Sequence, residues 1–152
     1  MITAAVRVKA GVVSRDQYEG GERRKLNLGH TFAHAVETLA RRGATSMDSD
    51  NEIVAITHGE AVAMGLVLAA RLSDRVFHGD MQTPTQQECR MRSDLLGCGI
   101  NPDCPFVVGE MSEIMKKDKK GEGGKVHFVL IRETGDVVVK NLSVDEVIRL
   151  MA

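Results

Sequence analysis

Residues 59–77 form a long segment that is apolar on nearly every side when it is drawn as a helix. A surface helix keeps its apolar residues in one stripe, whereas a helix that is apolar all round is stable only when other elements cover it. The pattern therefore predicts a buried central helix. Its apolar positions are Ala61, Val62, Met64, Leu66, Val67, Leu68 and Leu72.

The remaining segments predict a mainly α fold with one small β-hairpin late in the chain. Apolar residues at spacings of three and four predict a helix from Leu26 to Arg42, with Gly43 at its end. Further helices are predicted for residues 2–11, 84–96 and 107–117, and for a short final segment after a capping box at residues 143–146. The runs KVHFVLI and DVVVK flank a turn at residues 133–135 and predict the hairpin.

The composition excludes several classes of function. Twenty Lys and Arg residues against 21 Asp and Glu residues give a net charge of -1, so there is no general basic field for nucleic acid. One Tyr, four Phe and no Trp offer few platforms for base stacking. The most apolar run, residues 61–70, is too short to span a membrane, and the start of the chain does not resemble a signal peptide. Three cysteines without a C-x-x-C pair fit a reducing compartment, so we expect a cytoplasmic protein.

Three histidines are candidates for a metal site. His30 and His34 stand four residues apart in a predicted helix, which places both imidazoles on one face. Zinc proteases have a similar H-E-x-x-H arrangement, but Thr31 stands where the glutamate would be, which excludes that class. His58 precedes Gly59 at the start of the buried helix. Two histidines of one helix and one of a neighbour can form an open site for zinc or cobalt. The alternative is three hydrogen-bonded structural histidines.

Arg23 and Asn27 extend this pattern toward the N-terminus. With the two histidines they are spaced by four, three and four positions, so all four residues line one face if the segment is helical throughout. A guanidinium, an amide and two imidazoles suit a small molecule that is rich in oxyanions. The alternative is a polar face in contact with solvent. The lysines within residues 116–120 either close over a phosphate or remain solvated.

These blocks together resemble the signature of the 3-dehydroquinate synthase family. The resemblance rests on RRKLNLGHTFAHAVE at residues 23–37, HGEAVAMG at 58–65 and MKKDKK at 115–120. It implies the mainly α, helical C-terminal domain of the dehydroquinate synthase-like fold, with the hairpin late in the chain. It also implies an NAD-dependent lyase of the shikimate pathway that requires zinc or cobalt. Such an enzyme converts 3-deoxy-D-arabino-heptulosonate 7-phosphate, a sugar phosphate, to 3-dehydroquinate and phosphate.

The resemblance also implies roles for individual residues. The implied metal ligands are His30 and His58; the phosphate ligands are Asn27 and Lys119; the ligands of the substrate carboxylate are Lys9 and Arg23; and His34 contacts substrate and moves protons. Lys119 is implied as a catalytic residue as well, and Lys120 is the alternative to it.

The resemblance implies that residues 1–152 are part of the C-terminal domain. It also implies that two parts of the enzyme are absent from the chain: the N-terminal NAD-binding domain and a third metal ligand, a glutamate. We therefore expect the chain to be inactive alone and to need that missing domain, while a homodimer stays open. Residues 44–57 are an insertion relative to the family pattern. Two alternatives remain open. One is a related sugar-phosphate cyclase or a metal-dependent polyol dehydrogenase, and the other is a non-catalytic helical fragment that binds metal or phosphate.

Overall fold

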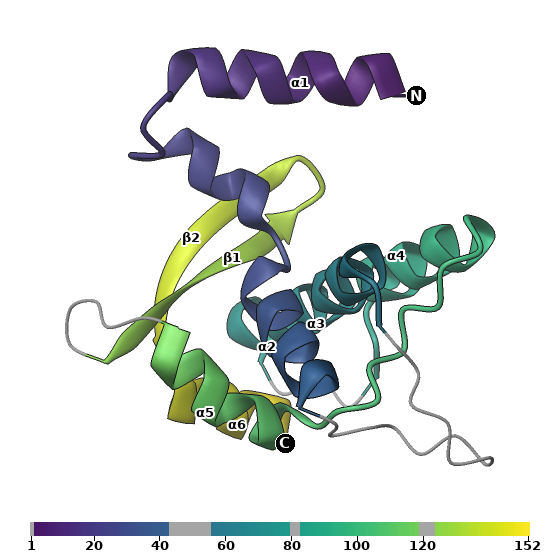
Figure 1. Cartoon of the computed structure of the whole chain (residues 1–152), viewed down its shortest axis with the longest axis vertical. Helices are drawn as coiled ribbons and strands as arrows, with labels where there is room; N and C mark the ends of the chain where they lie inside the picture. Colours follow the sequence, from purple (N-terminus) through teal and green to yellow (C-terminus); the bar gives the residue numbers. More distant parts are fainter. Residues whose placement is uncertain (1, 43–55, 80–82, 119–123) are drawn as a thin grey trace.

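A computed structural model describes residues 2–42, 56–79, 83–118 and 124–152. These residues form a helical body with one antiparallel hairpin, and the N-terminal helix lies apart from that body (Figure 1). The elements are α1 (Ile2–Arg15), the 3₁₀ helix η1 (Glu22–Asn27), α2 (His30–Arg41), α3 (His58–His78), α4 (Gln86–Gly97), α5 (Val108–Asp118), β1 (Lys125–Glu133), β2 (Asp136–Ser143) and α6 (Val144–Met151). The predicted fold class, mainly α with a late hairpin, is confirmed.

Helix α3 is the centre of the molecule, as its pattern of apolar residues predicts. Helices α2, α4 and α6 and strand β1 all pack against it, while α5 packs against α2 and α6. Phe32 of α2 and Phe128 of β1 join this core, with ring centroids 5.5 Å apart. The buried apolar residues of α3 are Ala61, Ala63, Met64, Val67, Leu68, Ala69, Ala70 and Leu72. The first turns of α2 and α3 are thereby carried on a packed core.

The crossing of α2 and α3 is a direct contact between two backbones. Gly29 has a φ of 79°, a left-handed conformation that glycine adopts without strain. A β-carbon at Gly29 would lie 2.7 Å from the amide nitrogen of Leu66, and one at Gly65 would overlap the carbonyl oxygen of Gly29. Only glycine fits at both positions, so this pair sets how closely the two helices approach.

The start of α2 differs from the sequence prediction. The helix predicted from Leu26 begins at His30, because Leu28 (ψ 127°) and Gly29 leave the helical conformation. The local pattern of apolar residues is compatible with a continuous helix. The break instead follows from the close approach of Gly29 to α3.

The end of α1 also differs from its prediction. The helix passes through Gly11 and continues to Arg15. A glycine inside a helix costs only about 1 kcal/mol relative to alanine, and Val12 beyond it is buried. Residues 43–55, which hold most of the predicted insertion, lie outside the described residues.

The hairpin and α6 follow their predicted boundaries closely. Val129 of β1 lies opposite Val139 of β2, and the strands are joined at Thr134 and Gly135. Gly135 has a φ of 92°, which explains why glycine occupies the turn. The amide of Glu146 then donates to the Ser143 hydroxyl oxygen at 3.1 Å, which caps the start of α6.

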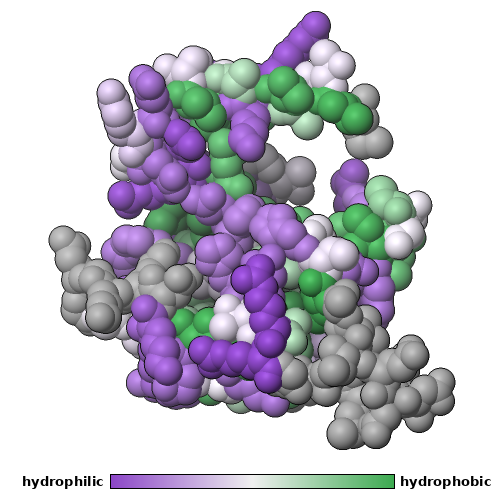
Figure 2. Space-filling model, viewed as in Figure 1, coloured by the Kyte–Doolittle hydropathy of each residue, from purple (hydrophilic) through white to green (hydrophobic). Residues whose placement is uncertain are grey.

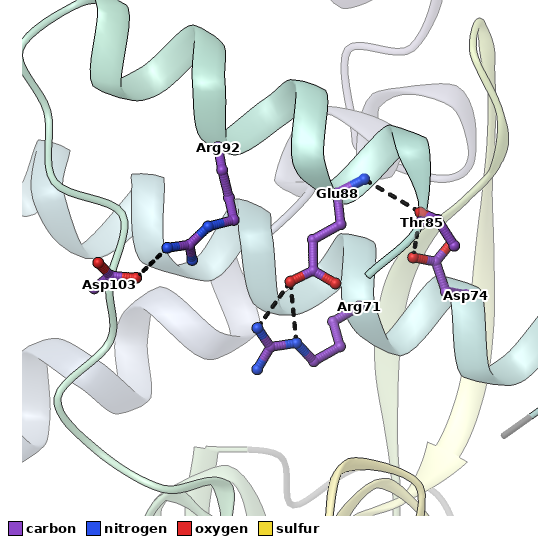
Figure 3. Close-up of polar contacts among 6 residues, drawn as sticks. All are labelled: Arg71, Asp74, Thr85, Glu88, Arg92 and Asp103. Carbon is purple, nitrogen blue, oxygen red and sulfur yellow. Dashed lines mark hydrogen bonds and ion pairs between the residues drawn. The ribbon is translucent and has the colours of Figure 1, made fainter. Parts of the chain in front are cut away.

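Polar contacts fix α4 on α3 (Figure 3). Arg71 of α3 donates from Nε and Nη2 to Oε1 of Glu88, at 3.2 and 2.8 Å, and Glu88 is only 2% exposed. Thr85, which caps α4, donates to the Asp74 carboxylate at 2.6 Å. Burial raises the pKa of the Asp74 carboxyl above its usual range, although the hydrogen bond from Thr85 opposes this shift. The buried charges at this contact are therefore hydrogen-bonded across the two helices.

Ser73 joins α3 to the hairpin. Its hydroxyl donates to the carbonyl oxygen of Ala69 at 2.5 Å and accepts the amide of Ile131 at 2.9 Å, within the buried core. Replacing Ser73 by alanine would leave the Ile131 N–H without this acceptor, so we expect the free energy of unfolding to fall by about 1–3 kcal/mol. Urea denaturation measures the loss. As a control, Ser14→Ala removes an exposed hydroxyl and is expected to change the free energy of unfolding by less than about 0.5 kcal/mol. Equal losses in the two variants would contradict the buried hydrogen bond between Ser73 and Ile131.

Helix α1 exposes apolar side chains to solvent. Ile2, Val6 and Val8 are 83%, 59% and 64% exposed. Figure 2 shows hydrophobic surface along the upper edge of the molecule, where α1 lies in Figure 1. Val12 is the buried residue of this helix. Among the described helices, none is long and apolar enough to cross a lipid bilayer.

Candidate functional site

The first residues of α2 and α3 bring two imidazole rings together. The ring centroids of His30 and His58 lie 6.3 Å apart, with the ring planes inclined at 66°. Gly29 turns the chain into α2, and Thr57 caps α3. In that cap the Thr57 hydroxyl accepts the Glu60 amide, while the Glu60 carboxylate accepts the Thr57 amide at 2.8 Å. The start of α3 is thus defined by its own capping box, and that of α2 by Gly29 against α3. The predicted approach of His30 to His58 is confirmed.

In both rings the Nδ1 nitrogen contacts a group that only accepts hydrogen bonds. His58 Nδ1 lies 2.9 Å from Oε1 of Glu37 on α2, and His30 Nδ1 lies 3.3 Å from the carbonyl oxygen of Leu28. Because a carboxylate and a carbonyl oxygen accept, these contacts assign the proton of each neutral ring to Nδ1. The Nε2 nitrogen then carries the lone pair, which is the common arrangement in metal-binding histidines.

The separation and chemistry of the two rings fit a shared divalent metal. Two imidazoles on one tetrahedral zinc have ring centroids roughly 5.2 Å apart, given Zn–N bonds of about 2.0–2.1 Å. The observed 6.3 Å exceeds this by only about an ångström. In the described parts of the chain, no group of three or more His, Cys, Asp or Glu residues could hold a metal ion. The described residues therefore offer two ligands, and a complete centre needs more.

The other three histidines occupy different surroundings. His34 lies one turn after His30 on α2 and is exposed. His78 is exposed at the opposite end of α3 from His58, and a helix of this length spans about 30 Å. The ring of His127 is hydrogen-bonded to Asn141 across the hairpin. His34 is thus the histidine nearest in the helix to the candidate metal pair, and His78 is remote from it, as expected.

The predicted continuous face of Arg23, Asn27 and the two histidines is wrong. The segment before Leu28 is a 3₁₀ helix, and the helical path breaks at Leu28 and Gly29. In a 3₁₀ helix the side chains three residues apart are aligned, whereas those four apart are not. Arg23 accordingly turns to the preceding loop, where its Nη1 donates to the carbonyl oxygen of Gln17 at 2.7 Å.

Asn27 instead shares a pocket with Arg24, three residues before it. The residues that line this pocket of ≈ 230 Å³ are Glu19, Arg24, Asn27, Thr31, His127, Val129 and Val139. The Asn27 amide donates to the Glu19 carboxylate at 2.6 Å, and Arg24 Nε donates to the Glu19 carbonyl oxygen at 3.0 Å. The pocket therefore presents the guanidinium of Arg24 beside the start of α2, together with an amide that is hydrogen-bonded to the Glu19 carboxylate.

Asp16 holds the loop that leads into η1. Its carboxylate accepts the backbone amides of Gly20, Gly21 and Arg23, at 2.8, 2.8 and 2.9 Å. These hydrogen bonds, with that from Arg23 the strongest influence, hold the pKa of the Asp16 carboxyl below its usual range. The backbone of Arg23 is therefore anchored.

Of the lysines implied as substrate ligands, the structure describes only Lys9. Lys9 is exposed on α1, which packs on η1. Lys119 and its alternative Lys120 lie outside the described residues. The structure thus brings together His30 and His58, and separately Asn27 and Arg24.

Sequence reasoning misses two residues near these groups, Arg24 and Glu37. On an α-helix Arg24 would point away from the face of Arg23, so only knowledge of the 3₁₀ geometry would find it. Glu37 follows His34 by three residues and His30 by seven. These spacings put all three residues on one face of α2, a signal that the sequence does carry.

The fold and the paired imidazoles define a helical domain with a candidate centre for a divalent metal. The chain matches the family model described as 3-dehydroquinate synthase C-terminal over residues 1–121. It therefore belongs to the 3-dehydroquinate synthase family.

Proteins named 3-dehydroquinate synthase match nearly the whole chain. The protein of Halalkalibacterium halodurans is 37% identical over 142 residues, which cover 93% of this chain and 36% of that protein. The protein of Xanthomonas oryzae pv. oryzae is 39% identical over 145 residues, 95% of this chain and 37% of that protein. The protein of Acidithiobacillus ferrooxidans is 39% identical over 132 residues, 86% of this chain and 32% of that protein. The chain thus spans about a third of the length of these curated relatives.

Proposed function

We propose that the chain is the metal- and substrate-binding domain of a 3-dehydroquinate synthase. In this proposal the complete enzyme is a lyase of the shikimate pathway. It converts 3-deoxy-D-arabino-heptulosonate 7-phosphate to 3-dehydroquinate and phosphate. The observation that carries the proposal is the approach of His30 to His58, with Nδ1 of each ring already hydrogen-bonded. Membership of the family supports the reaction.

His30 and His58 would hold a divalent metal ion, zinc or cobalt. When bound, the ion would supply polarisation of the substrate's hydroxyl oxygens, and NAD would supply the acceptor for hydride. His34, exposed one turn beyond His30, would bind the substrate and move protons to and from it. The two helix starts keep these imidazoles on a rigid core, which favours orientation of the substrate.

The anionic ends of the substrate call for cationic and amide groups. Asn27 and Lys119 would hold the phosphate, and charge neutralisation by Lys119 would favour its departure. Lys9 and Arg23 would hold the carboxylate. Arg24 is a second candidate for an anionic group, because it shares the pocket with Asn27.

The proposed enzyme needs a second domain that binds NAD and supplies a further metal ligand. The chain spans about a third of its relatives, which leaves room for such a domain in the complete protein. Exposed Ile2, Val6 and Val8 on α1 suit the docking of that domain. We propose the cytoplasm as its location, where free cysteines stay reduced.

The isolated chain is expected to release no phosphate from the substrate when NAD and Zn²⁺ are supplied, because in this proposal NAD binds to a portion of the relatives that this chain does not cover. A fusion to the preceding portion of the Halalkalibacterium halodurans relative is expected to restore turnover, measured as released phosphate and 3-dehydroquinate. Turnover by the isolated chain would contradict the domain assignment. A folded fusion that binds NAD and Zn²⁺ but releases no phosphate would contradict the proposed reaction.

A further inference from the structure

We infer that Glu37 is a positioning residue for His58, which fixes the imidazole so that Nε2 is presented as a metal ligand. The inference rests on the proposed metal-binding role of His30 and His58. Glu37 itself acts on the metal only through the ring. Helix α2 would then supply one ligand, His30, and the group that orients the other.

The contact has the geometry of a charge-assisted hydrogen bond. Nδ1 of His58 lies 2.9 Å from Oε1 of Glu37, which is close to the distance expected for a nitrogen donor on a carboxylate. The side chain of His58 is 66% exposed, whereas that of Glu37 is 16% exposed. The exposed partner is therefore the imidazole, and the carboxylate that it contacts is mostly enclosed. A metal ligand is preorganised when a neighbouring group holds its side chain in place, and the enclosed Glu37 carboxylate can hold the His58 ring in this way.

The contact also selects the form of the ring that can bind a metal. A carboxylate can only accept, so it holds the proton on Nδ1 and leaves the lone pair on Nε2. In water a neutral imidazole is free to place the proton on either nitrogen. A carboxylate on the second nitrogen also raises the basicity of the ligand nitrogen, and losing such a partner typically weakens metal affinity.

The start of α3 does not depend on Glu37. Thr57 and Glu60 form a complete capping box at this end of the helix, and their hydrogen bonds lower the pKa of the Glu60 carboxyl. Glu60 therefore acts on the backbone beside His58, while Glu37 acts on the ring. This division separates a positioning role from a purely structural one.

Two measurements test the inference: zinc affinity in the fusion, which supplies the further metal ligand, and the tautomer of His58 in the 152-residue chain. Zn²⁺ binding is measured by competition with a chromophoric chelator, and the tautomer by ¹⁵N NMR of the metal-free chain at about pH 8, where imidazoles are generally neutral. Glu37→Ala is expected to weaken Zn²⁺ binding by about 10–100-fold and to shift His58 toward the Nε2–H tautomer. Glu37→Gln keeps an accepting oxygen and should lose less affinity.

Glu60→Ala is the matched control, because it removes a carboxylate beside His58 without touching the ring. An affinity loss in Glu60→Ala as large as that in Glu37→Ala would overturn the inference, as would a wild-type His58 that is mainly Nε2–H. Unchanged Zn²⁺ affinity in Glu37→Ala would overturn it while leaving the proposed function intact. A parent fusion that binds no Zn²⁺ would overturn the proposed metal role, and this inference with it.

Discussion

Replacing His58 by alanine in the active fusion is expected to lower kcat/KM for phosphate release by about a thousandfold or more. His58 and His30 are the two described candidates for metal ligands, and a bound metal contributes several kcal/mol of transition-state stabilisation. A loss of about 4 kcal/mol corresponds to three factors of ten in rate. His30→Ala should be equally damaging. Steady-state kinetics with a continuous phosphate assay measures both variants.

His78→Ala provides the control on the same helix, because His78 is exposed at the other end of α3 from His58. Its kcat/KM is expected to stay within about twofold of the parent, as for a surface substitution remote from the site. A chelator should remove the activity of the parent fusion, and Zn²⁺ or Co²⁺ should restore it. Near-parental kinetics for His58→Ala would exclude His58 as a ligand of the catalytic metal.

Replacing Gly65 by alanine is expected to cost about 3 kcal/mol of unfolding free energy, at the upper end of the range for overpacking. The new β-carbon would overlap the carbonyl oxygen of Gly29 and lie 3.0 Å from the amide nitrogen of Ala33. Both obstacles are backbone atoms, which cannot move aside without separating α2 from α3. Thermal unfolding of the chain should therefore show a melting temperature lower by about 6–12 °C.

Gly59→Ala is the matched control within the same helix. A β-carbon at Gly59 meets no atom within 4 Å, so alanine should be neutral or stabilising by up to about 1 kcal/mol. Gly65→Ala should also weaken Zn²⁺ binding, because separating the helices moves His30 away from His58. Equal melting temperatures for the two variants would show that the helix crossing is looser than described.

The sequence predicts the architecture well where one local signal dominates. Helix α3 is found from residues 59–77 because burial on all sides leaves an apolar pattern on all sides. The hairpin is found because the period of the apolar residues changes and Gly135 supplies the turn. The approach of His30 to His58 is also predicted: the residue pattern leaves a structural role for the three histidines open, and the resemblance singles out this pair as metal ligands. Nothing local relates two residues so far apart in the chain.

The errors arise where tertiary contacts decide the backbone. Gly29 looks like an ordinary residue within a helical pattern, yet its contact with Leu66 favours a left-handed conformation there. The preceding segment, Glu22–Asn27, is a 3₁₀ helix, in which residues three apart are aligned. Arg24, and not Arg23, therefore lines the pocket with Asn27. The contact between Glu37 and His58 joins two helices, so the sequence offers only the position of Glu37 on the face of α2.

The glycine contact between α2 and α3 makes the spacing of the two imidazoles independent of the chain that connects the helices. His30 follows one glycine directly, and His58 precedes the other by seven residues, about two helical turns. Residues 43–55 can then vary in length among homologous sequences without shifting either ligand. A search for distant members of the family can therefore leave the length of this connection open. The search should require a glycine immediately before the histidine that corresponds to His30, and a second glycine seven residues after the histidine that corresponds to His58.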